Sequence, residues 1–399
     1  MDSLLAERLK ERMRFEHARS APPEGFPGFP DIPAGRYTDP GFFALEQRRI
    51  WSKTWLFAGH EDELPEVGSY RLWDDSGKPM LLVRGLDRQV RAFFNTCRHR
   101  GGPVVRDVSG RAPVLRCSYH GWTYDLAGQL VAVPDERDFV GLDKSCRGLL
   151  PLRCESFGRF LFVNEDASAA PLLDWLGPVA RELAEFQPER LRLVERHGFD
   201  LACNWKVAID AFLEVYHLKH IHPHTVDRLL DQRGAVMGLF ANGHSRMVTP
   251  NRTGDQGTHG FPEIETVGEI ARIANLAYNV FPNLVTPTDA TGFPFLLFWP
   301  RGITKTRFEV WWFAPGDSTP ELETRWQQRL QIFDVVLRED TANLEWIQKS
   351  VESPAFRGVP LNYQERRIYW LHEEIDRVLG DEVPTHLRVA PRLARYLET

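Results

Sequence analysis

Two short segments decide the fold: CRH at residues 97–99 and, seventeen residues later, CSYH at residues 117–120. Each segment offers one thiol and one imidazole: Cys97 and His99 in the first, Cys117 and His120 in the second. A structural zinc site is the alternative, but zinc fingers order their ligands as two cysteines and then two histidines. Two loops with one ligand of each kind suit a two-iron cluster in which one iron takes both cysteines and the other both histidines.

Short strands broken by turns surround these segments and predict a small all-β domain. The strands are expected at residues 69–73, 80–83, 90–94 and 160–163. Turn residues such as Asp75-Ser76-Gly77 separate them. Longer helical patterns appear after about Asp166 and indicate a larger α+β domain. The expected organisation is a helix and Pro/Gly-rich arm at 1–40, the β domain at 41–166 and the larger domain at 167–399.

A second group of metal-binding side chains stands in the larger domain. On a helix, Asp210, Glu214 and His217 share one face. A buried stripe of two carboxylates and a histidine is costly unless a metal or hydrogen bonds compensate it, so a polar network in the core remains the alternative. His222 precedes Pro223, which disfavours helical geometry there. The helix can therefore end between the two histidines and let His222 fold back.

A third ligand is predicted from a long helix at about residues 321–351. Its apolar stripe has one gap, and Asp340 falls in that gap, whereas Asp334 lies roughly 100° from the stripe's centre. A lone carboxylate that points into an apolar interface should be paired or metal-bound. His220 and His224 are expected at the surface or beside the site. His217, His222 and Asp340 are then expected to form the triad of non-haem Fe(II) oxygenases.

The two groups together resemble the Rieske non-haem iron oxygenases, specifically the terminal-oxygenase or alpha subunits of the ring-hydroxylating type. Besides the Cys/His pattern, the resemblance is carried by WSKTW at 51–55, HGWTY at 120–124, NWK at 204–206, FPNL at 281–284 and RED at 338–340. It covers nearly the whole chain. It implies an α+β fold with an N-terminal all-β Rieske [2Fe-2S] domain. A helix-grip (START-like) catalytic domain follows, with an antiparallel sheet over a long C-terminal helix.

The resemblance also implies a role for Glu214. In the family, the carboxylate three residues before the first iron histidine bridges to a Rieske histidine of the neighbouring subunit in a head-to-tail trimer. It carries electrons across that interface. From the residues alone, Glu-x-x-His could equally make Glu214 an iron ligand, as in di-iron bundles. Ala211 departs from the many members that carry asparagine at this position.

The implied activity is that of an oxygenase with a Rieske [2Fe-2S] cluster and mononuclear Fe(II). It would take O2 as co-substrate and NAD(P)H-derived electrons from a ferredoxin and/or flavin reductase. We expect a homotrimer that hydroxylates an apolar, aromatic small molecule, as in aromatic hydrocarbon catabolism, by mono- or dioxygenation. Oxidative O- or N-demethylation, including that of a quaternary amine, is the alternative. An electron carrier whose ligand-binding domain lacks iron and a zinc-stabilised interaction module are two further hypotheses.

Aromatic and aliphatic residues near the expected triad predict an apolar substrate pocket. The candidates are Phe212, Leu213, Leu218, Phe281 and Phe295. Aromatic rings stack on arenes, but they also hold quaternary ammonium groups by cation–π attraction. They are equally common in any protein core. The pattern therefore leaves the substrate class open.

Composition limits the partners and the compartment. The 399 residues include 49 basic and 55 acidic side chains, a net charge of −6. That balance argues against nucleic acid or an anionic membrane as a partner. No apolar run reaches the roughly 18 residues of a membrane span, and the N-terminus lacks the features of a secretion signal. Five cysteines are too few for a disulfide scaffold and favour a reduced, cytoplasmic setting.

Overall fold

The computed structural model describes residues 1, 3–255 and 257–398. They form two compact units, which are Trp51–Leu172 and the combination of Met1–Ile50 with Leu173–Thr399. The N-terminal helix and arm, expected as a separate segment, therefore belong to the larger unit. They are held there because Leu9 and Met13 are buried and Lys10 forms an ion pair with Glu269.

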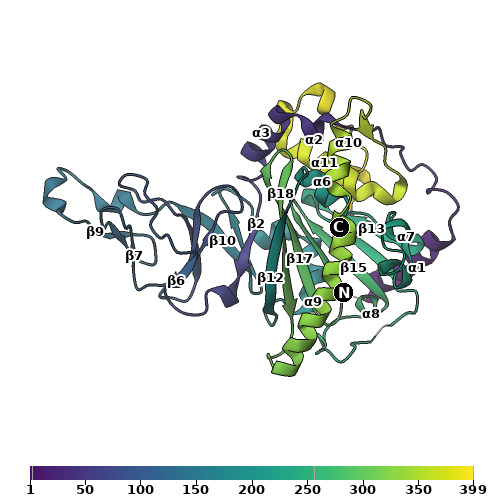
Figure 1. The fold of residues 1–399 in the computed structure, drawn as a ribbon, viewed down its shortest axis with the longest axis horizontal. Coiled ribbons are helices and arrows are strands. Elements are labelled where there is room, and N and C mark those ends of the chain that lie inside the picture. The colour runs from purple at the N-terminus through teal and green to yellow at the C-terminus, as the bar shows by residue number, and fades with distance from the viewer. Residues whose placement is uncertain (2, 256, 399) are drawn as a thin grey trace. The chain divides into compact units, whose positions relative to one another are not determined.

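The smaller unit consists mainly of short strands joined by loops (Figure 1). Seven strands form one sheet in the order β2-β11-β10-β5-β4-β3-β6, and three form a second sheet, β7-β8-β9. Their bounds are β2 Leu56–His60, β3 Ser69–Trp73, β4 Met80–Arg84, β5 Val90–Phe94, β6 Ser109–Arg111, β7 Leu115–Arg116, β8 Thr123–Tyr124, β9 Leu130–Ala132, β10 Pro151–Phe157 and β11 Phe160–Asn164. The expected strands thus occur at their predicted places. Cys97 and Cys117 lie in this unit's buried core beside Trp122 and Tyr124.

The larger unit contains a seven-stranded antiparallel sheet in the order β12-β18-β17-β16-β15-β14-β13. Its strands are β12 Arg192–Leu201, β13 Val236–Leu239, β14 Ser245–Pro250, β15 Ala274–Val280, β16 Leu284–Thr288, β17 Phe293–Gly302 and β18 Lys305–Ala314. A separate pair joins β1 Ile32–Pro33 to β19 Gly358–Val359. In β17, the eight residues from Phe293 to Pro300 are all buried, so both faces of the sheet are covered there.

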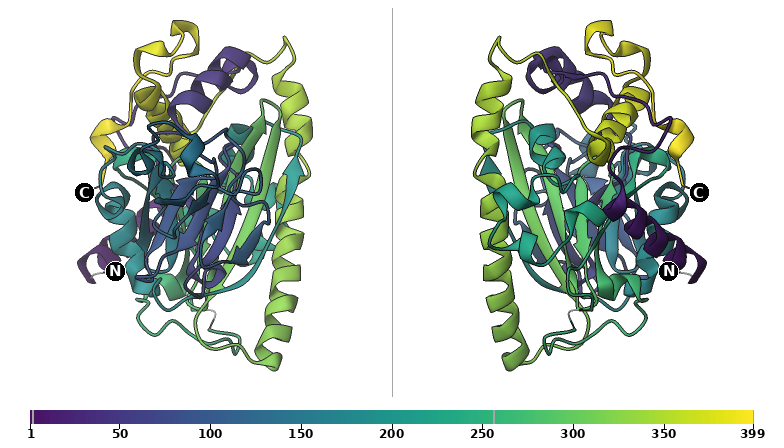
Figure 2. Two further views of the ribbon diagram at one scale, coloured as in Figure 1. Left: turned by 90° about the vertical axis from the view of Figure 1, so that its left-hand side faces the viewer. Right: turned by 90° about the vertical axis from the view of Figure 1, so that its right-hand side faces the viewer.

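Helices cover this sheet, and Figure 2 shows the longest of them, α9, running beside its strands. Their bounds are α1 Ser3–Ala18, α2 Gly35–Thr38, α3 Pro40–Arg49, α4 Leu172–Leu176, α5 Pro178–Leu183, α6 Trp205–Asp210, α7 Leu218–Ile221, α8 Ile270–Ile273, α9 Pro320–Thr341, α10 Leu344–Val351 and α11 Arg366–Leu379. The Thr319 side chain caps α9 by accepting a hydrogen bond from the Leu322 amide. An all-β domain followed by an antiparallel sheet with long C-terminal helices confirms the expected fold class.

Two expected helices are each broken once. The late helix divides at residues 342–343 into α9 and α10, which leaves Asp340 in the last turn of α9. The helix expected to carry Asp210, Glu214 and His217 ends at Asp210, and the next helix, α7, begins at Leu218. These three side chains therefore do not share one continuous helix face.

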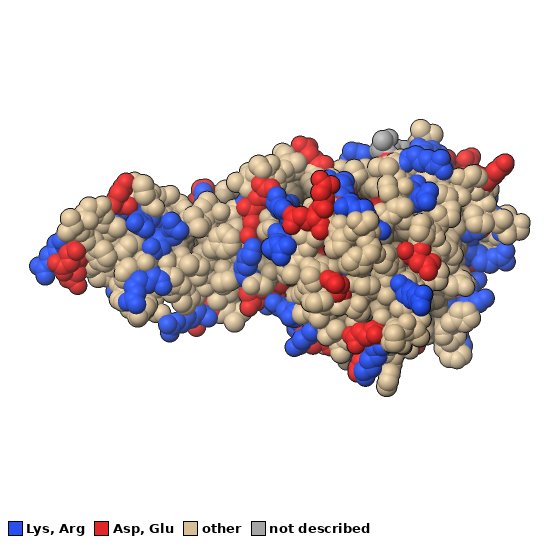
Figure 3. Space-filling model, turned by 90° about the horizontal axis from the view of Figure 1, so that it is seen from above, with Lys and Arg blue, Asp and Glu red and all other residues tan. Residues whose placement is uncertain are grey.

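Charged side chains of both signs are interspersed on the face shown in Figure 3. Among the described residues, no helix has the length and apolar character needed to cross a membrane.

Candidate metal centres

The first Cys/His group lies on two loops of matching geometry in the smaller unit. In each loop the cysteine amide donates to the carbonyl five residues later, and the amide four residues later donates to the cysteine carbonyl. These bonds measure 2.8 and 3.0 Å at Cys97, and 2.9 Å each at Cys117. Both loops turn at a glycine with positive φ, +73° at Gly101 and +71° at Gly121. The two segments therefore present their side chains in the same way.

The donor atoms of these loops are arranged by kind. Cys97 and Cys117 are buried, whereas His99 is half-buried and His120 is exposed. The two imidazole rings lie side by side, with centroids 4.6 Å apart. Burial raises the pKa of the Cys97 thiol, although the hydroxyl of Tyr124, 3.3 Å from its sulfur, favours the thiolate. Because burial disfavours the thiolate, these two sulfurs would ionise beside a bound cation. Two thiolates and two imidazoles are the ligand set of a Rieske cluster.

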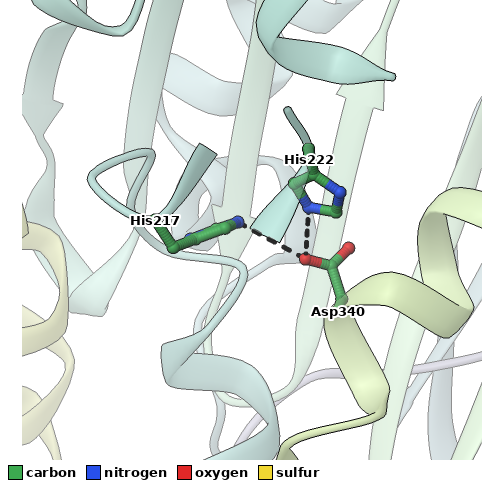
Figure 4. A group of neighbouring side chains, drawn as sticks. All are labelled: His217, His222 and Asp340. Atoms are coloured by element: carbon green, nitrogen blue, oxygen red, sulfur yellow. Dashed lines mark hydrogen bonds and ion pairs between the residues drawn. The ribbon is translucent and has the colours of Figure 1, made fainter. Parts of the chain in front are cut away.

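The second group converges in the larger unit (Figure 4). His217 and His222 flank helix α7, and Asp340 reaches them from the end of α9. The Nε2 atom of His222 is 2.8 Å from Asp340 Oδ1, and that of His217 is 3.4 Å from the same oxygen. One ligand atom from each residue lies within 4.8 Å of the other two. These three residues, here called the triad, could hold a metal ion.

Glu214 shapes the segment before the first triad histidine. Its Oε1 accepts a hydrogen bond from His217 Nδ1, and its Oε2 accepts from the amides of Tyr216 and His217. A side chain that binds nearby amides competes with helical hydrogen bonds, which explains why α6 ends before this segment. Both oxygens of Glu214 are thus engaged. In this arrangement Glu214 orients His217 and does not join the triad as a fourth ligand.

A matching carboxylate orients the second histidine. The Nδ1 atom of His222 is 2.7 Å from Glu339 Oε2, which also accepts a hydrogen bond from the Thr225 hydroxyl at 2.6 Å. Each imidazole therefore holds a proton on Nδ1. Its Nε2 atom faces Asp340 in the metal-free protein and is the nitrogen that would bind a metal once it has lost its own proton, as in metal-binding histidines. The role of Glu339 was not expected from the sequence, although the residue belongs to the RED segment at 338–340. Its position directly before Asp340 was the feature that could have indicated this role.

The other candidates lie outside the triad. His220 and His224 are exposed. Asp334, the rival of Asp340, lies 3.1 Å from the Nε2 atom of His197. The helical phase that favoured Asp340 over Asp334 thus agrees with the arrangement of the described residues.

The triad is charged in the metal-free protein. Burial opposes ionisation of Asp340, but its hydrogen bonds with His217 and His222 outweigh burial and lower its pKa. Burial likewise disfavours the charged form of His217, yet its bonds to Asp340 and Glu214 raise its pKa to about 10. At neutral pH His217 is therefore an imidazolium, and a metal must displace its proton to bind.

Described residues of this unit enclose two cavities that concern the site. The first, here called the triad cavity, has a volume of about 500 Å³. Polar groups on its wall are His217, Asp340, Tyr37, Asp210, Glu214, Glu365 and Asn343, and most of the remaining wall is apolar. The second, the α9 cavity, measures about 650 Å³ and extends along α9 from Arg325 to Val336. Val336 is one helical turn before Asp340, so this cavity approaches the triad.

The expected pocket residues line neither of these cavities. Leu213, Leu218, Phe281 and Phe295 are buried, whereas Phe212 is half-buried with its ring centroid 5.2 Å from that of Phe298. Other apolar side chains near the triad in sequence do reach the walls: Val207, Ala211 and Ile221 line the triad cavity, and Val226 lines the α9 cavity. Residues remote in sequence from the triad histidines, such as Phe261 and Trp312, complete the α9 cavity wall.

Comparison with protein families matches both units. Residues 54–148 match the Rieske [2Fe-2S] domain, and residues 188–381 match the catalytic domain of the ring hydroxylating alpha subunit. The carnitine monooxygenase oxygenase subunit of Escherichia coli (strain K12) is 33% identical over 207 residues, 50% of this chain and 55% of that protein. Biphenyl dioxygenase subunit alpha of Paraburkholderia xenovorans (strain LB400) is 34% identical over 195 residues, 45% of this chain and 42% of that protein. The matched segments thus span about half the length of these relatives.

Solved structures share the fold. A quaternary ammonium Rieske monooxygenase in complex with L-carnitine superposes with a TM-score of 0.73 at 22% identity, covering 90% of this chain and 99% of that chain. Naphthalene 1,2-dioxygenase from Rhodococcus sp. bound to indole gives 0.74 at 22% identity, covering 96% and 100%. With both domains matched and their characteristic residues in place, this chain belongs to the alpha subunits of the Rieske non-haem iron, ring-hydroxylating oxygenases.

Proposed function

We propose that this chain is the terminal oxygenase of a multicomponent system that uses NAD(P)H-derived electrons and O2 to hydroxylate a neutral, apolar, aromatic small molecule. One observation carries the proposal: a single chain holds both the paired Cys/His loops and the converging triad. Iron(II) bound by two histidines and a carboxylate supplies dioxygen activation. An electron carrier without catalytic iron would have no need of the triad.

The chain's residues take distinct roles in this proposal. Cys97, Cys117, His99 and His120 hold the [2Fe-2S] cluster, and the triad of His217, His222 and Asp340 holds iron(II). Two imidazoles in place of thiolates raise the cluster's potential. Glu214 and Glu339 orient the triad histidines. Glu214 lies at the triad cavity, where its position suits the further role of linking His217 to a neighbouring subunit's cluster.

The α9 cavity suits a neutral substrate better than a cation. The guanidinium of Arg329 lies 5.0–5.5 Å from the ring centroids of Phe261, Trp312 and Trp326. It also forms an ion pair with Asp289. This aromatic group is where a quaternary ammonium ion would gain cation–π attraction, but a cation of the protein already fills it. The remaining wall is mainly apolar and suits an arene.

Oxidative demethylation of a quaternary amine is the second candidate. It is favoured by the names of relatives that act on carnitine and glycine betaine. The same iron chemistry would serve both substrates, so the choice depends on the cavity wall. The position of Arg329 is the reason for preferring the neutral arene.

The proposed enzyme works with partners. A ferredoxin and/or a flavin reductase supplies electrons, and three copies form a head-to-tail trimer, a heterologous interface closed by rotation. We base a cytoplasmic setting on the five cysteines, none of which forms a disulfide among the described residues.

Replacing Asp340 with alanine should remove the triad iron and leave the cluster. We expect iron to fall from about three to about two atoms per chain, with acid-labile sulfide and the Rieske absorption and EPR signals unchanged and turnover lost. The matched control is Asp334→Ala on the same helix, which should retain all the iron. If Asp334→Ala loses the iron and Asp340→Ala keeps it, the ligand assignment is wrong.

Binding of Fe(II) to protein with an empty triad should release protons. With the pKa of His217 raised to about 10, this side chain is protonated at pH 7 and must lose its proton to bind iron. We expect about one proton or more per iron, and an affinity that rises with pH by up to about tenfold per unit until pH approaches 10. Anaerobic calorimetry in buffers of different ionisation enthalpy measures the protons. His220→Ala should not alter the count, and a count of zero at pH 7 would contradict the charged state.

Neutral arenes should bind the α9 cavity better than quaternary ammonium compounds do. Removing the guanidinium with Arg329→Gln vacates the aromatic group, and we expect L-carnitine or glycine betaine to gain roughly tenfold or more in affinity. Lys349→Gln is the control, because Lys349 is exposed on α10 and lines neither of these cavities. Calorimetry with naphthalene, indole and L-carnitine measures the preference. Tighter binding of L-carnitine than of every arene to the unaltered protein would support the demethylation alternative.

Electron transfer between subunits predicts complementation. Cys97→Ser lacks a cluster and Asp340→Ala lacks iron, so each is inactive alone. Mixed assemblies should regain part of the activity, because one chain's cluster can serve its neighbour's iron. Glu214→Gln should keep both metal centres and slow the cluster-to-iron step by on the order of 10–100-fold in single-turnover experiments. Absence of recovery in verified mixed trimers would mean that electrons travel within one chain.

A further inference from the structure

A chain of buried hydrogen bonds connects helix α2 to the triad cavity. The Nε atom of Arg36 donates to His372 Nδ1 at 2.9 Å, and His372 Nε2 lies 3.1 Å from the hydroxyl oxygen of Tyr37. That hydroxyl donates to Asp210 Oδ2 at 2.8 Å. Arg36, Tyr37 and His372 are each at most 2% exposed. Residues from three parts of the chain, far apart in sequence, thus form one continuous path.

The direction of every bond in this path follows from Arg36. A guanidinium has no acceptor, so Nδ1 of His372 must accept, and the imidazole proton is on Nε2. Burial and the charges of Arg36 and Lys206 hold the pKa of His372 well below its usual range, so the ring is neutral. Nε2–H therefore donates to Tyr37, and Tyr37 directs its own proton to Asp210. The path supports Asp210 as a hydrogen-bond acceptor whether or not its other oxygen is protonated.

Asp210 is the end of the path and lies on the wall of the triad cavity. The same wall includes His217 and Asp340. Oδ1 of Asp210 is buried and has no hydrogen-bond partner among the described residues. One oxygen of this carboxyl is thus held by Tyr37, and the other is available for a proton.

Few other groups on that wall can exchange a proton. His217 and Asp340 are the proposed metal ligands, and both oxygens of Glu214 are engaged by His217 and the neighbouring amides. Burial and the nearby Asp210 raise the pKa of Tyr37 well above its usual range, so this hydroxyl keeps its proton. Among the described residues of the wall, two carboxyl groups remain, Asp210 and Glu365.

The charges around Asp210 keep it near the point of half-protonation. Burial raises its pKa to about 7, against the hydrogen bond from Tyr37 and the positive charges of Lys206 on its own helix and Arg36 on α2. Both cations have their own carboxylate, Lys206 that of Glu46 and Arg36 that of Asp376. His372 of α11 faces Asp210 as a neutral ring, 3.6 Å away. Glu214 and Glu365 also lie at the cavity. Burial, together with the charges of Glu214 and Asp210, raises the pKa of Glu365 to about 7 as well.

The proposed reaction needs protons at this cavity. Hydroxylation of a C–H bond takes O2, two electrons and two protons and yields one C–OH group and one water. Dihydroxylation of an arene takes the same electrons and protons and yields two C–OH groups. In both cases the electrons come from the cluster and the protons come from solvent through groups on the cavity wall.

We propose that Asp210 is the proton donor of the triad cavity, with Tyr37 and His372 as its positioning residues. Protonated Oδ1 would give its proton, through water in the cavity, towards dioxygen at the triad, whose residues would hold the iron that activates it. The resulting carboxylate is stabilised by the Tyr37 hydroxyl and regains a proton from solvent. This inference depends on the proposed oxygenase function.

The first test reads the protonation state without turnover. Infrared difference spectra between the unaltered protein and Asp210→Asn, across a pH series on the protein without iron in the triad, isolate the Asp210 carboxyl. We expect half-protonation close to pH 7. Tyr37→Phe removes a hydrogen bond that stabilises the carboxylate and should move this midpoint to higher pH. An Asp210 that is ionised throughout pH 5–9, or a midpoint that Tyr37→Phe leaves in place, would overturn the proposal.

The second test follows turnover with pH. Protonated Asp210 is the donor, so turnover of the reconstituted holoenzyme should fall as pH rises through about 7, and Tyr37→Phe should move that fall upward. Asp210→Asn should retain iron and sulfide, lose this pH dependence and slow turnover by on the order of 100-fold. Unchanged turnover in Asp210→Asn, or loss of the alkaline fall in Glu365→Gln instead, would overturn the assignment. If the unaltered protein consumes no O2 with any arene or amine tested, the oxygenase function itself fails, whereas the infrared midpoint still tests Asp210.

Discussion

Asp340 brings a negative charge into an almost closed interior, and the surrounding catalytic unit is arranged to offset that charge. Its side chain is about one-tenth exposed and has His217 and His222 as partners. Helix α9 carries this carboxylate in its last turn, opposite the histidines. The end of α7 at Ile221 is equally necessary, because a helix that continued through His222 would direct the two imidazoles to different faces. A bound cation completes this charge balance, which is why the site suits a metal.

The parts of the site that repeat a local pattern were predictable from sequence. The Cys/His spacing identified both Rieske loops because each loop is a short turn whose geometry depends on its own residues. Asp340 was distinguished from Asp334 by helical phase, since α9 is regular up to its last turn. Pro223 disfavours helical geometry at His222, and this indicated that the helix ends before His222. These inferences needed only local backbone preferences.

The parts that depend on side chains competing with the backbone, or on distant contacts, were not predictable. Glu214 binds two amides of its own segment and ends the helix, a choice that spacing alone does not reveal. Phe281 and Phe295 look suited to a pocket, but Phe281 is buried in the turn between β15 and β16, and Phe295 lies in a strand that is buried on both faces. Tyr37 and Asp210 are 173 positions apart. Their contact joins α2 to the end of α6, and hydrogen bonds from α2 to His372 of α11 accompany it. No periodicity encodes such a contact.

Three histidines of this unit show how a neighbour decides what an imidazole can do. His217 and His222 have carboxylates at Nδ1, so the proton lies on that atom and Nε2 offers a lone pair to a metal. His372 has a guanidinium at Nδ1, so its proton lies on Nε2, which can donate but cannot bind a cation. The same side chain is therefore a ligand beside glutamate and a hydrogen-bond donor beside arginine. The catalytic unit uses the first arrangement at the triad and the second to hold Tyr37 against Asp210.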